Sequence, residues 1–414
     1  MKEAILSNLD NPVQLEQLYR TDKPAFKRSF NALYPQLKDT SIGGFWYARL
    51  HYSKEDISWG SSKDLVFVMV AALISGLIAK LPTILSIDEE AFYTRNAGFI
   101  VFPALAAYFI WKRKLSLNHI AVVVGTFLVS VLFINFLPGS LQSDTLLLSC
   151  MHLPVLLWAA TGLAFIGGQI APVEKRLRYL SYNGDLVVMT TLILIAGGIL
   201  TGVTIGLFNL IGFRIEDLYF QYVVIVGLPA APILGTYLIR SNPQLVGKVS
   251  PVIARIFSPL VLVMLVIYLG AIVYSGKDPY NDREFLLIFN VLLIGVMAII
   301  FFSVAEASKK ESNRTETWVL FLLSVVTIVV NGIALSAILF RISTGGITPN
   351  RAAVLGSNVL ILINLLLVTV QLFKVVSKKT DINAVGKAIA WFLPVYCLWA
   401  AIVSFLFPFL FGHQ

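Results

Sequence analysis

Charge is scarce in this sequence, and its scarcity excludes most soluble folds. Aspartate, glutamate, lysine and arginine make up only 13% of the 414 residues, and 57% of the residues are hydrophobic. A soluble domain usually carries about 25% charged residues. The apolar residues also come in long uninterrupted runs that short charged segments separate. These features exclude a chain of soluble domains and predict an integral membrane protein that crosses the bilayer many times.

Cysteine and histidine are too few to build the sites that they usually build. Cys150 and Cys397 lie inside apolar runs, which excludes a disulfide framework or a thiolate metal cluster and favours buried free thiols over a single pair. The four histidines are scattered and form no metal-binding pair. The sequence therefore implies no metal and no cofactor.

Ionisable residues are missing from the middle of the apolar runs, where transporters and intramembrane enzymes usually place them. Lys80 is the exception, and no aspartate pair or serine–histidine arrangement suited to hydrolysis is present. We therefore assign no catalytic residue, and a membrane-embedded enzyme is the least favoured class. The net charge of +9 is interpreted as a topology signal, so no nucleic-acid partner is predicted.

Eleven apolar runs suit membrane-spanning helices, which need about 20 residues each. Their unbroken apolarity excludes the alternating strands of a membrane barrel. The predicted spans are 65–85, 97–111, 117–137, 145–170, 186–210, 218–239, 254–275, 285–305, 318–340, 351–373 and 388–411. The predicted fold is an all-α polytopic bundle of about eleven helices that occupies residues 61–414.

Lysine and arginine are distributed unevenly between the loops, and this gives the helices an orientation because basic residues stay on the cytoplasmic side. With the N-terminus inside, the inner segments hold 25 of the 32 basic residues and the outer segments hold 6. We therefore predict a cytoplasmic N-terminus and an outer C-terminus. Insertion topology, together with contact with anionic lipid headgroups, is enough to explain this sorting.

Residues 1–60 are polar and predict a small helical cytoplasmic module, with no cleavable signal peptide before it. Asn11 is suited to cap one helix. Phe26 and Phe30 share a face of a second helix, which Pro35 should end. We expect this aromatic face to dock on the membrane surface or on the inner loops. A partner-binding or regulatory module is the alternative.

Proline and histidine inside the spans supply the first candidate features of a site. Pro229 and Pro232 should break or bend the sixth span, either as an inert kink or as the lining of a substrate site. His152 is a candidate ligand-binding residue because an imidazole can titrate near neutral pH.

Small and amide side chains inside the spans predict helix packing. The fifth span carries a series of glycines that favours close packing of helices, Gly197, Gly198, Gly202 and Gly206. Several amides lie within or near spans and should hydrogen-bond between helices, among them Asn135, Asn290, Asn331 and Asn358.

The outer connection between the ninth and tenth spans carries two arginines and no carboxylate. Thr348 is suited to cap the tenth helix. The start of that helix, the Gly345-Gly346 turn and the guanidiniums of Arg341 and Arg351 would together suit a phosphate or a carboxylate. The alternative is a salt bridge between these arginines and an acidic outer loop.

The same loop resembles a known sequence signature. Arg341-Ile342 followed by Gly346-Ile347-Thr348-Pro349-Asn350-Arg351 is similar to the R-I-x-x-x-G-L-T-P-N-R motif of a bacterial family called domain of unknown function 4153. The resemblance is sharpest over about 11 residues and does not extend to residues 1–60. It implies a multi-pass protein of the bacterial plasma (inner) membrane and supplies no substrate.

Two classes of function remain open. The first is a permease-like protein, or one that binds an anionic solute or lipid headgroup at the outer face through Arg341, Thr348, Arg351 and His152. The second is a membrane scaffold or sensor that transports nothing. The expected partners are membrane lipids and an anionic small molecule, and no protein partner is predicted.

Overall fold

The computed structural model describes residues 1–51, 61–139, 142–168, 172–210, 213–246, 249–275, 280, 283–308 and 314–412. Over these residues the protein is helical and contains no strand, as the sequence predicts. Contacts divide the chain into two compact units, Met1–Ser58 and Trp59–Gln414.

The first unit is built from four helices whose starts are set by local sequence. They are α1 (Lys2–Leu6), α2 (Pro12–Thr21), α3 (Lys23–Leu37) and α4 (Ser41–His51). The Asn11 side chain accepts a hydrogen bond from the Gln14 amide, which confirms the predicted cap. Pro35 lies inside α3, so the predicted end at this residue is wrong by two residues. A proline in the last turn removes only one intrahelical hydrogen bond, which the helix tolerates.

The aromatic face of α3 is buried inside the first unit itself. Phe26 and Phe30 are fully buried, and both rings pack against Trp46 of α4. Ile5 of α1 and Leu15 of α2 complete the same core. The expectation that this face docks on a membrane is therefore wrong, because three further helices of the same unit cover it.

The second unit contains eleven long helices within the described residues. They are α5 (Ser62–Ala79), α7 (Glu89–Arg113), α8 (Leu117–Phe136), α9 (Asp144–Ile166), α10 (Val173–Leu210), α12 (Ile225–Ser241), α14 (Val249–Ser275), α15 (Arg283–Ala307), α16 (Arg314–Gly345), α17 (Pro349–Val376) and α18 (Ile382–Ala401). Shorter segments join or extend them, namely α6 (Leu81–Leu85), α11 (Glu216–Tyr219), the π-helical η1 (Phe220–Val224), α13 (Pro243–Val246), the π-helical η2 (Ile402–Leu406) and α19 (Phe407–Phe411).

Ten helical segments of the described chain are long and apolar enough to cross a membrane, which makes this a multi-pass membrane protein. The remaining long helix, α7, has 25 residues. It runs antiparallel to α5 and α8, the long helices before and after it in the chain. Near its start, Arg95 donates to the Ile134 and Leu137 carbonyls where α8 ends, and Lys112 in its last turn pairs with Asp64 at the start of α5. The count of eleven crossings stays a prediction.

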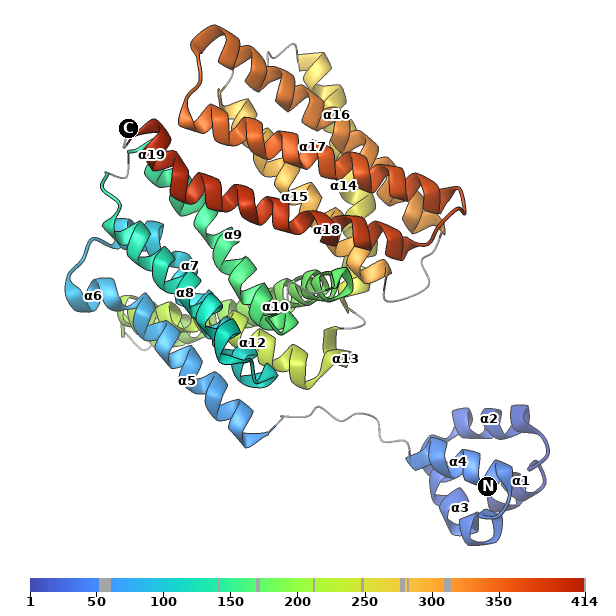
Figure 1. Ribbon diagram of the computed structural model, residues 1–414. Helices are drawn as coiled ribbons and strands as arrows, with labels where there is room; N and C mark the ends of the chain where they lie inside the picture. The colour runs from blue at the N-terminus through green and yellow to red at the C-terminus, as the bar shows by residue number, and fades with distance from the viewer. Residues whose placement is uncertain are drawn as a thin grey trace. The chain divides into compact units, whose positions relative to one another are not determined.

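The long helices pack as two groups with separate apolar cores (Figure 1). The first helix group comprises α5, α7, α8, α9 and α12, and the second comprises α14, α15, α16 and α17. The two bridging helices, α10 and α18, contact members of both groups. The junction between the groups is therefore formed largely by α9, α10, α15 and α18.

The sixth predicted span is continuous through both of its prolines. Pro229 and Pro232 lie inside α12, so the predicted helix break does not occur. The irregularity lies earlier in the chain, in η1, which is a π-helical turn. Such a turn is a common way for a helix to absorb a local disturbance. The Gln221 carbonyl in this turn accepts a hydrogen bond from Lys80 Nζ at 3.0 Å.

The glycine series of the fifth span does not pack against another helix of this chain. A Cβ added at Gly197, Gly198, Gly202 or Gly206 would meet no atom within 4 Å. The predicted close packing at these residues is therefore wrong within the chain. Close approach occurs instead at Gly76, where a Cβ would lie 2.6 Å from a Val226 methyl, and at Gly184, where it would meet the Phe302 ring.

Candidate anion-binding site

The predicted outer loop is stabilised by bonds to backbone carbonyls. Thr348 caps α17 by accepting a hydrogen bond from the Arg351 amide at 3.3 Å, as predicted. The Arg351 guanidinium turns back and donates to the Gly346 carbonyl at 2.7 Å. Arg341 donates to the Tyr280 carbonyl at 3.1 Å. The two guanidiniums therefore bind carbonyls of two different loops, and a shared ligand for them stays a prediction.

The position of Arg351 has a simple electrostatic reason. A cation in the first turn of a helix opposes the helix dipole, and Arg351 lies in the first turn of α17. Its guanidinium instead reaches the residue that follows α16, where unpaired carbonyls make the local potential negative. Arg351 thus stabilises the loop between α16 and α17.

His152 engages its own helix and not the outer loop. Its Nδ1 lies 2.9 Å from the Leu148 carbonyl, one turn earlier in α9. The side chain is half-buried. Its role in ligand binding stays a prediction.

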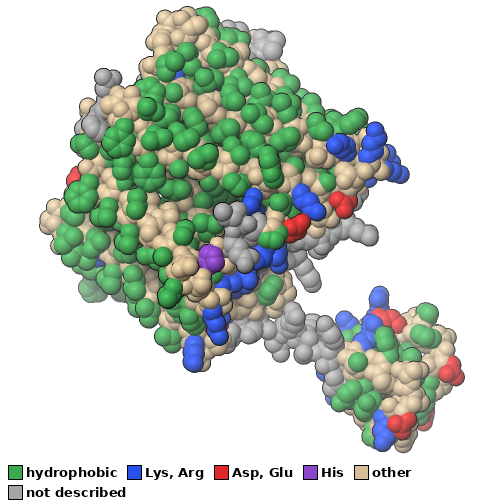
Figure 2. Space-filling model, viewed as in Figure 1, with side chains coloured by type: hydrophobic (Ala, Val, Ile, Leu, Met, Phe, Trp, Pro, Cys, Tyr) green, Lys and Arg blue, Asp and Glu red, His purple; other side chains and the backbone are tan. Residues whose placement is uncertain are grey.

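A basic cleft of about 490 Å³ opens between the two helix groups. The ends of α7, α9, α12 and α15 and the starts of α10 and α18 meet here, and we call this the basic end of the unit. Its charged lining consists of four cations and two carboxylates, Arg113, Lys175, Arg178, Arg240, Glu174 and Asp185. Figure 2 shows lysine and arginine side chains gathered toward the lower right of the second unit, while apolar side chains cover much of the remaining face.

Three arginines converge on this cleft from three different helices. Arg113 and Arg240 lie in the last turns of α7 and α12, where the helix dipole favours a cation. Their guanidinium carbons lie 5.6 and 5.9 Å from the centre of the same Phe165 ring. Arg178 lies at the start of α10. The positive charges of Arg178 and Arg240 both repel the charge of Arg113. Like charges held this close favour an anion between them.

Most of the remaining charges around the cleft have partners within the chain. Glu174 pairs with Lys387 at 3.5 Å, and Lys175 Nζ donates to the Ile166 carbonyl at 3.4 Å. Asp185 also interacts with another residue and is therefore not a free carboxylate. Arg178, by contrast, takes part in no hydrogen bond or ion pair within the described residues and is exposed. Its guanidinium is therefore available to a ligand.

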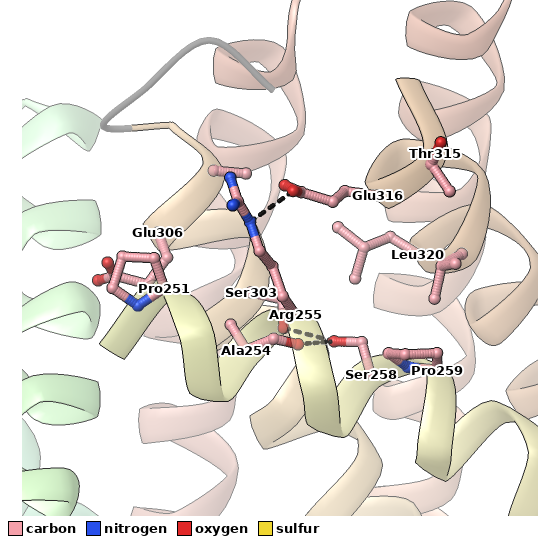
Figure 3. Close-up of a pocket in the computed structure, with 12 residues that line it drawn as sticks. Pro251, Ala254, Arg255, Ser258, Pro259, Ser303, Glu306, Thr315, Glu316 and Leu320 are labelled. Atoms are coloured by element: carbon pink, nitrogen blue, oxygen red, sulfur yellow. Dashed lines mark hydrogen bonds and ion pairs between the residues drawn. The ribbon is translucent and has the colours of Figure 1, made fainter. Parts of the chain in front are cut away.

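A smaller pocket of about 210 Å³ lies between α14, α15 and α16 (Figure 3). Arg255 reaches across it to Glu316 at 2.6 Å, and Ser258 and Ser303 share a hydrogen bond of 2.8 Å. Glu306 is buried at its edge and accepts a hydrogen bond from Ser181 of α10. Because its arginine is already paired with a carboxylate, this pocket suits an anion less well than the basic cleft does.

Four of the amides predicted to join helices do so, namely Asn135, Asn290, Asn331 and Asn358. Asn96 of α7 and Asn135 of α8 exchange two hydrogen bonds of 2.9 and 2.8 Å. Asn358 of α17 donates to Asn290 of α15 at 2.9 Å, and Asn331 of α16 donates to the Asn358 carbonyl. These amides hold helices together and do not line the basic cleft.

Sequence reasoning did not identify the basic cleft, although every residue of it was visible. Arg113, Arg178 and Arg240 were counted in three separate inner loops as topology signals. The only signal in the sequence is that these loops share a predicted side of the membrane. Their convergence on Phe165 depends on which helices are neighbours. Comparison with protein-family models, with curated proteins and with solved structures finds no match to this chain.

Proposed function

We propose that this integral membrane protein binds a phosphate-bearing anion in the basic cleft. The observation that supports the proposal is the convergence of three guanidiniums, from Arg113, Arg178 and Arg240, on one cleft of about 490 Å³. Guanidinium groups present several donors in a plane and match phosphate oxygens in pairs. The anion belongs either to a soluble molecule or to a lipid headgroup, because both offer the same oxygens.

The proposal includes an orientation and a location. Basic ends of membrane helices face the cytoplasm, so the cleft opens there, with the N-terminus inside and the C-terminus outside. The bacterial plasma membrane is proposed on the resemblance of the Arg341–Arg351 loop. This orientation puts the cleft on the side opposite to that loop, where sequence analysis predicted the anion site.

Binding is a better-supported activity than transport. A permease needs a path through the bundle, and Pro229 and Pro232 were its predicted lining. Neither proline is among the residues that line the basic cleft. A non-transporting sensor or scaffold that responds to an anion therefore fits these observations more closely than a permease does.

Binding of inorganic phosphate to the purified protein in detergent tests the proposal. A ligand at ten times its Kd stabilises a folded protein by about 1.4 kcal/mol. We expect phosphate to raise the Tm above that measured in sodium chloride of equal ionic strength. Arg178→Gln should abolish this difference, because it removes one of the three guanidiniums that converge on the cleft.

Arg351→Gln is the matched control, since it makes the same substitution in the outer loop. This variant should keep the full phosphate effect, with a small loss of Tm from the bond to Gly346. If Arg351→Gln loses the phosphate effect and Arg178→Gln keeps it, the outer loop is the anion site and the basic cleft is not. If wild-type protein gains nothing from phosphate, the proposed function fails.

A further inference from the structure

A second cavity of about 490 Å³ lies beyond the basic cleft and is almost entirely apolar. Helices α9, α10, α14, α15 and α18 line it. The two polar side chains that α9 and α10 contribute are bonded within the chain. Trp158 Nε1 donates to the Asn183 side-chain oxygen at 3.0 Å, and the Asn183 amide donates to the Tyr179 carbonyl. These two side chains therefore have few hydrogen-bonding groups left for a polar ligand.

The cleft and the apolar cavity are arranged along the same helices. Both are lined by α9, α10, α15 and α18, which form the junction between the two helix groups. On α9 the lining passes from Ile166 in the cleft to Trp158 in the cavity, and on α18 from Asn383 to Leu393. At 1.5 Å per residue these steps are about 12 and 15 Å. On these two helices the steps lead away from the basic end, whereas on α10 the two linings overlap, with Ser181 and Asp185 in the cleft and Asn183 in the cavity.

We infer that the anion is the headgroup phosphate of an anionic phospholipid, with an acyl chain of the same molecule in the apolar cavity. The inference rests on the proposed function, and it names the class of ligand. A phospholipid carries phosphate and acyl chain in this order along the bilayer normal, which matches a basic cleft at the helix ends and an apolar cavity that extends deeper along α9 and α18. A soluble anion has no apolar chain that could occupy the second cavity.

The physics of the bilayer predicts which lipids are distinguished. An acyl chain that moves from lipid into an apolar cavity gains packing contacts with the wall but no hydrophobic stabilisation, because lipid tails are as apolar as the cavity wall. Discrimination between lipids must then come from the headgroup. The arginines favour net negative charge, so phosphatidylglycerol should bind more tightly than phosphatidylcholine of the same chain composition.

The experiment compares four proteins with three probes. Full-length wild-type protein, Arg178→Gln, Ala298→Trp and Ala121→Trp are titrated in detergent with inorganic phosphate, phosphatidylglycerol and phosphatidylcholine, and the Tm is measured. Ala298 lines the apolar cavity and is exposed, so an indole there fills the cavity without displacing core side chains. Ala121 is an exposed alanine of α8, which lines neither cavity.

We expect Ala298→Trp to bind phosphatidylglycerol at least 10-fold more weakly than wild type and to bind phosphate as wild type does. Arg178→Gln should lose both ligands, and Ala121→Trp should keep both. If Ala298→Trp keeps phosphatidylglycerol binding, or if wild type does not prefer phosphatidylglycerol over phosphatidylcholine, the lipid inference is overturned while phosphate binding stands. Absence of phosphate binding in wild type overturns the proposed function itself, which keeps the two failures distinguishable.

Discussion

At the scale of single residues, cations inside the second unit close the ends of helices. Arg95 donates to the Ile134 and Leu137 carbonyls at the end of α8 and to the Gly139 carbonyl beyond it. Arg351 does the same after α16. The last carbonyls of a helix have no partner in the helix, and the local dipole attracts a cation. A charge near a membrane is therefore not by itself a sign of a ligand.

Arg95→Gln tests this structural use of a cation. The substitution removes a guanidinium that donates to three carbonyls, and we expect a loss of about 2–3 kcal/mol in the free energy of unfolding. Thermal denaturation in detergent should show a Tm lower by several degrees. Arg214→Gln is the control, because Arg214 is exposed and makes no hydrogen bond within the described chain. Equal Tm values for the two variants would show that the cap at α8 contributes nothing.

At the scale of helices, glycine allows close packing only where a partner is present. Gly76 of α5 faces Val226 of α12, and these helices form one of the extensive contacts of the first helix group. The series from Gly197 to Gly206 looks more suited to packing in the sequence, yet no atom of the described residues lies within 4 Å of where a Cβ would be on Gly197, Gly198, Gly202 or Gly206. Small residues permit close approach, but the neighbouring element decides whether it happens.

Alanine substitutions at Gly76 and Gly202 distinguish a glycine that packs against another helix from one that does not. A Cβ at Gly76 would lie 2.6 Å from a methyl of Val226, whose β-branched side chain has little freedom to move. Gly76→Ala should therefore cost about 1–3 kcal/mol of stability. Gly202→Ala meets nothing within 4 Å and should cost none, since alanine is the better helix former. Thermal denaturation of both variants is the measurement, and a larger loss in Gly202→Ala would contradict the packing described.

At the scale of the whole molecule, the arrangement of two helix groups creates the candidate site. Each group has its own core, and α10 and α18 connect them. The basic cleft and the apolar cavity both lie along this connection. Binding sites in helical proteins commonly lie between helices and at the junctions of packed units. The site is therefore a consequence of how the groups meet, and no single helix contains it.

The orientation of the bundle is testable with reporters at its two ends. A reporter that is active only in the cytosol should be active when it is inserted in the loop between α17 and α18, and inactive at the C-terminus. This follows because basic loops remain inside. Activity at the C-terminus, with none in the loop, would reverse the bundle. Activity at both would show that the number of crossings between them is even.

Local rules predicted much of the fold. Asn11 and Thr348 cap helices because a side-chain oxygen of the right length stands directly before each helix. The apolar runs became helices because lipid leaves backbone polar groups no other partner. The rules failed at Pro229, which lies inside the continuous helix α12, and at Phe26, which the other helices of the first unit cover. The second failure depends on contacts between segments that lie apart in the sequence.

The sequence by itself determined that this chain is a helical multi-pass membrane protein, and it predicts that the cations lie on one side of the membrane. Hydropathy and charge act on each segment separately at the boundary between water and lipid, so they can be read along the chain. Only the tertiary structure decided that Arg113, Arg178 and Arg240 surround one cleft beside Phe165. Inside a bilayer no hydrophobic force selects helix partners, and the choice depends on the fit of side chains that lie far apart in sequence.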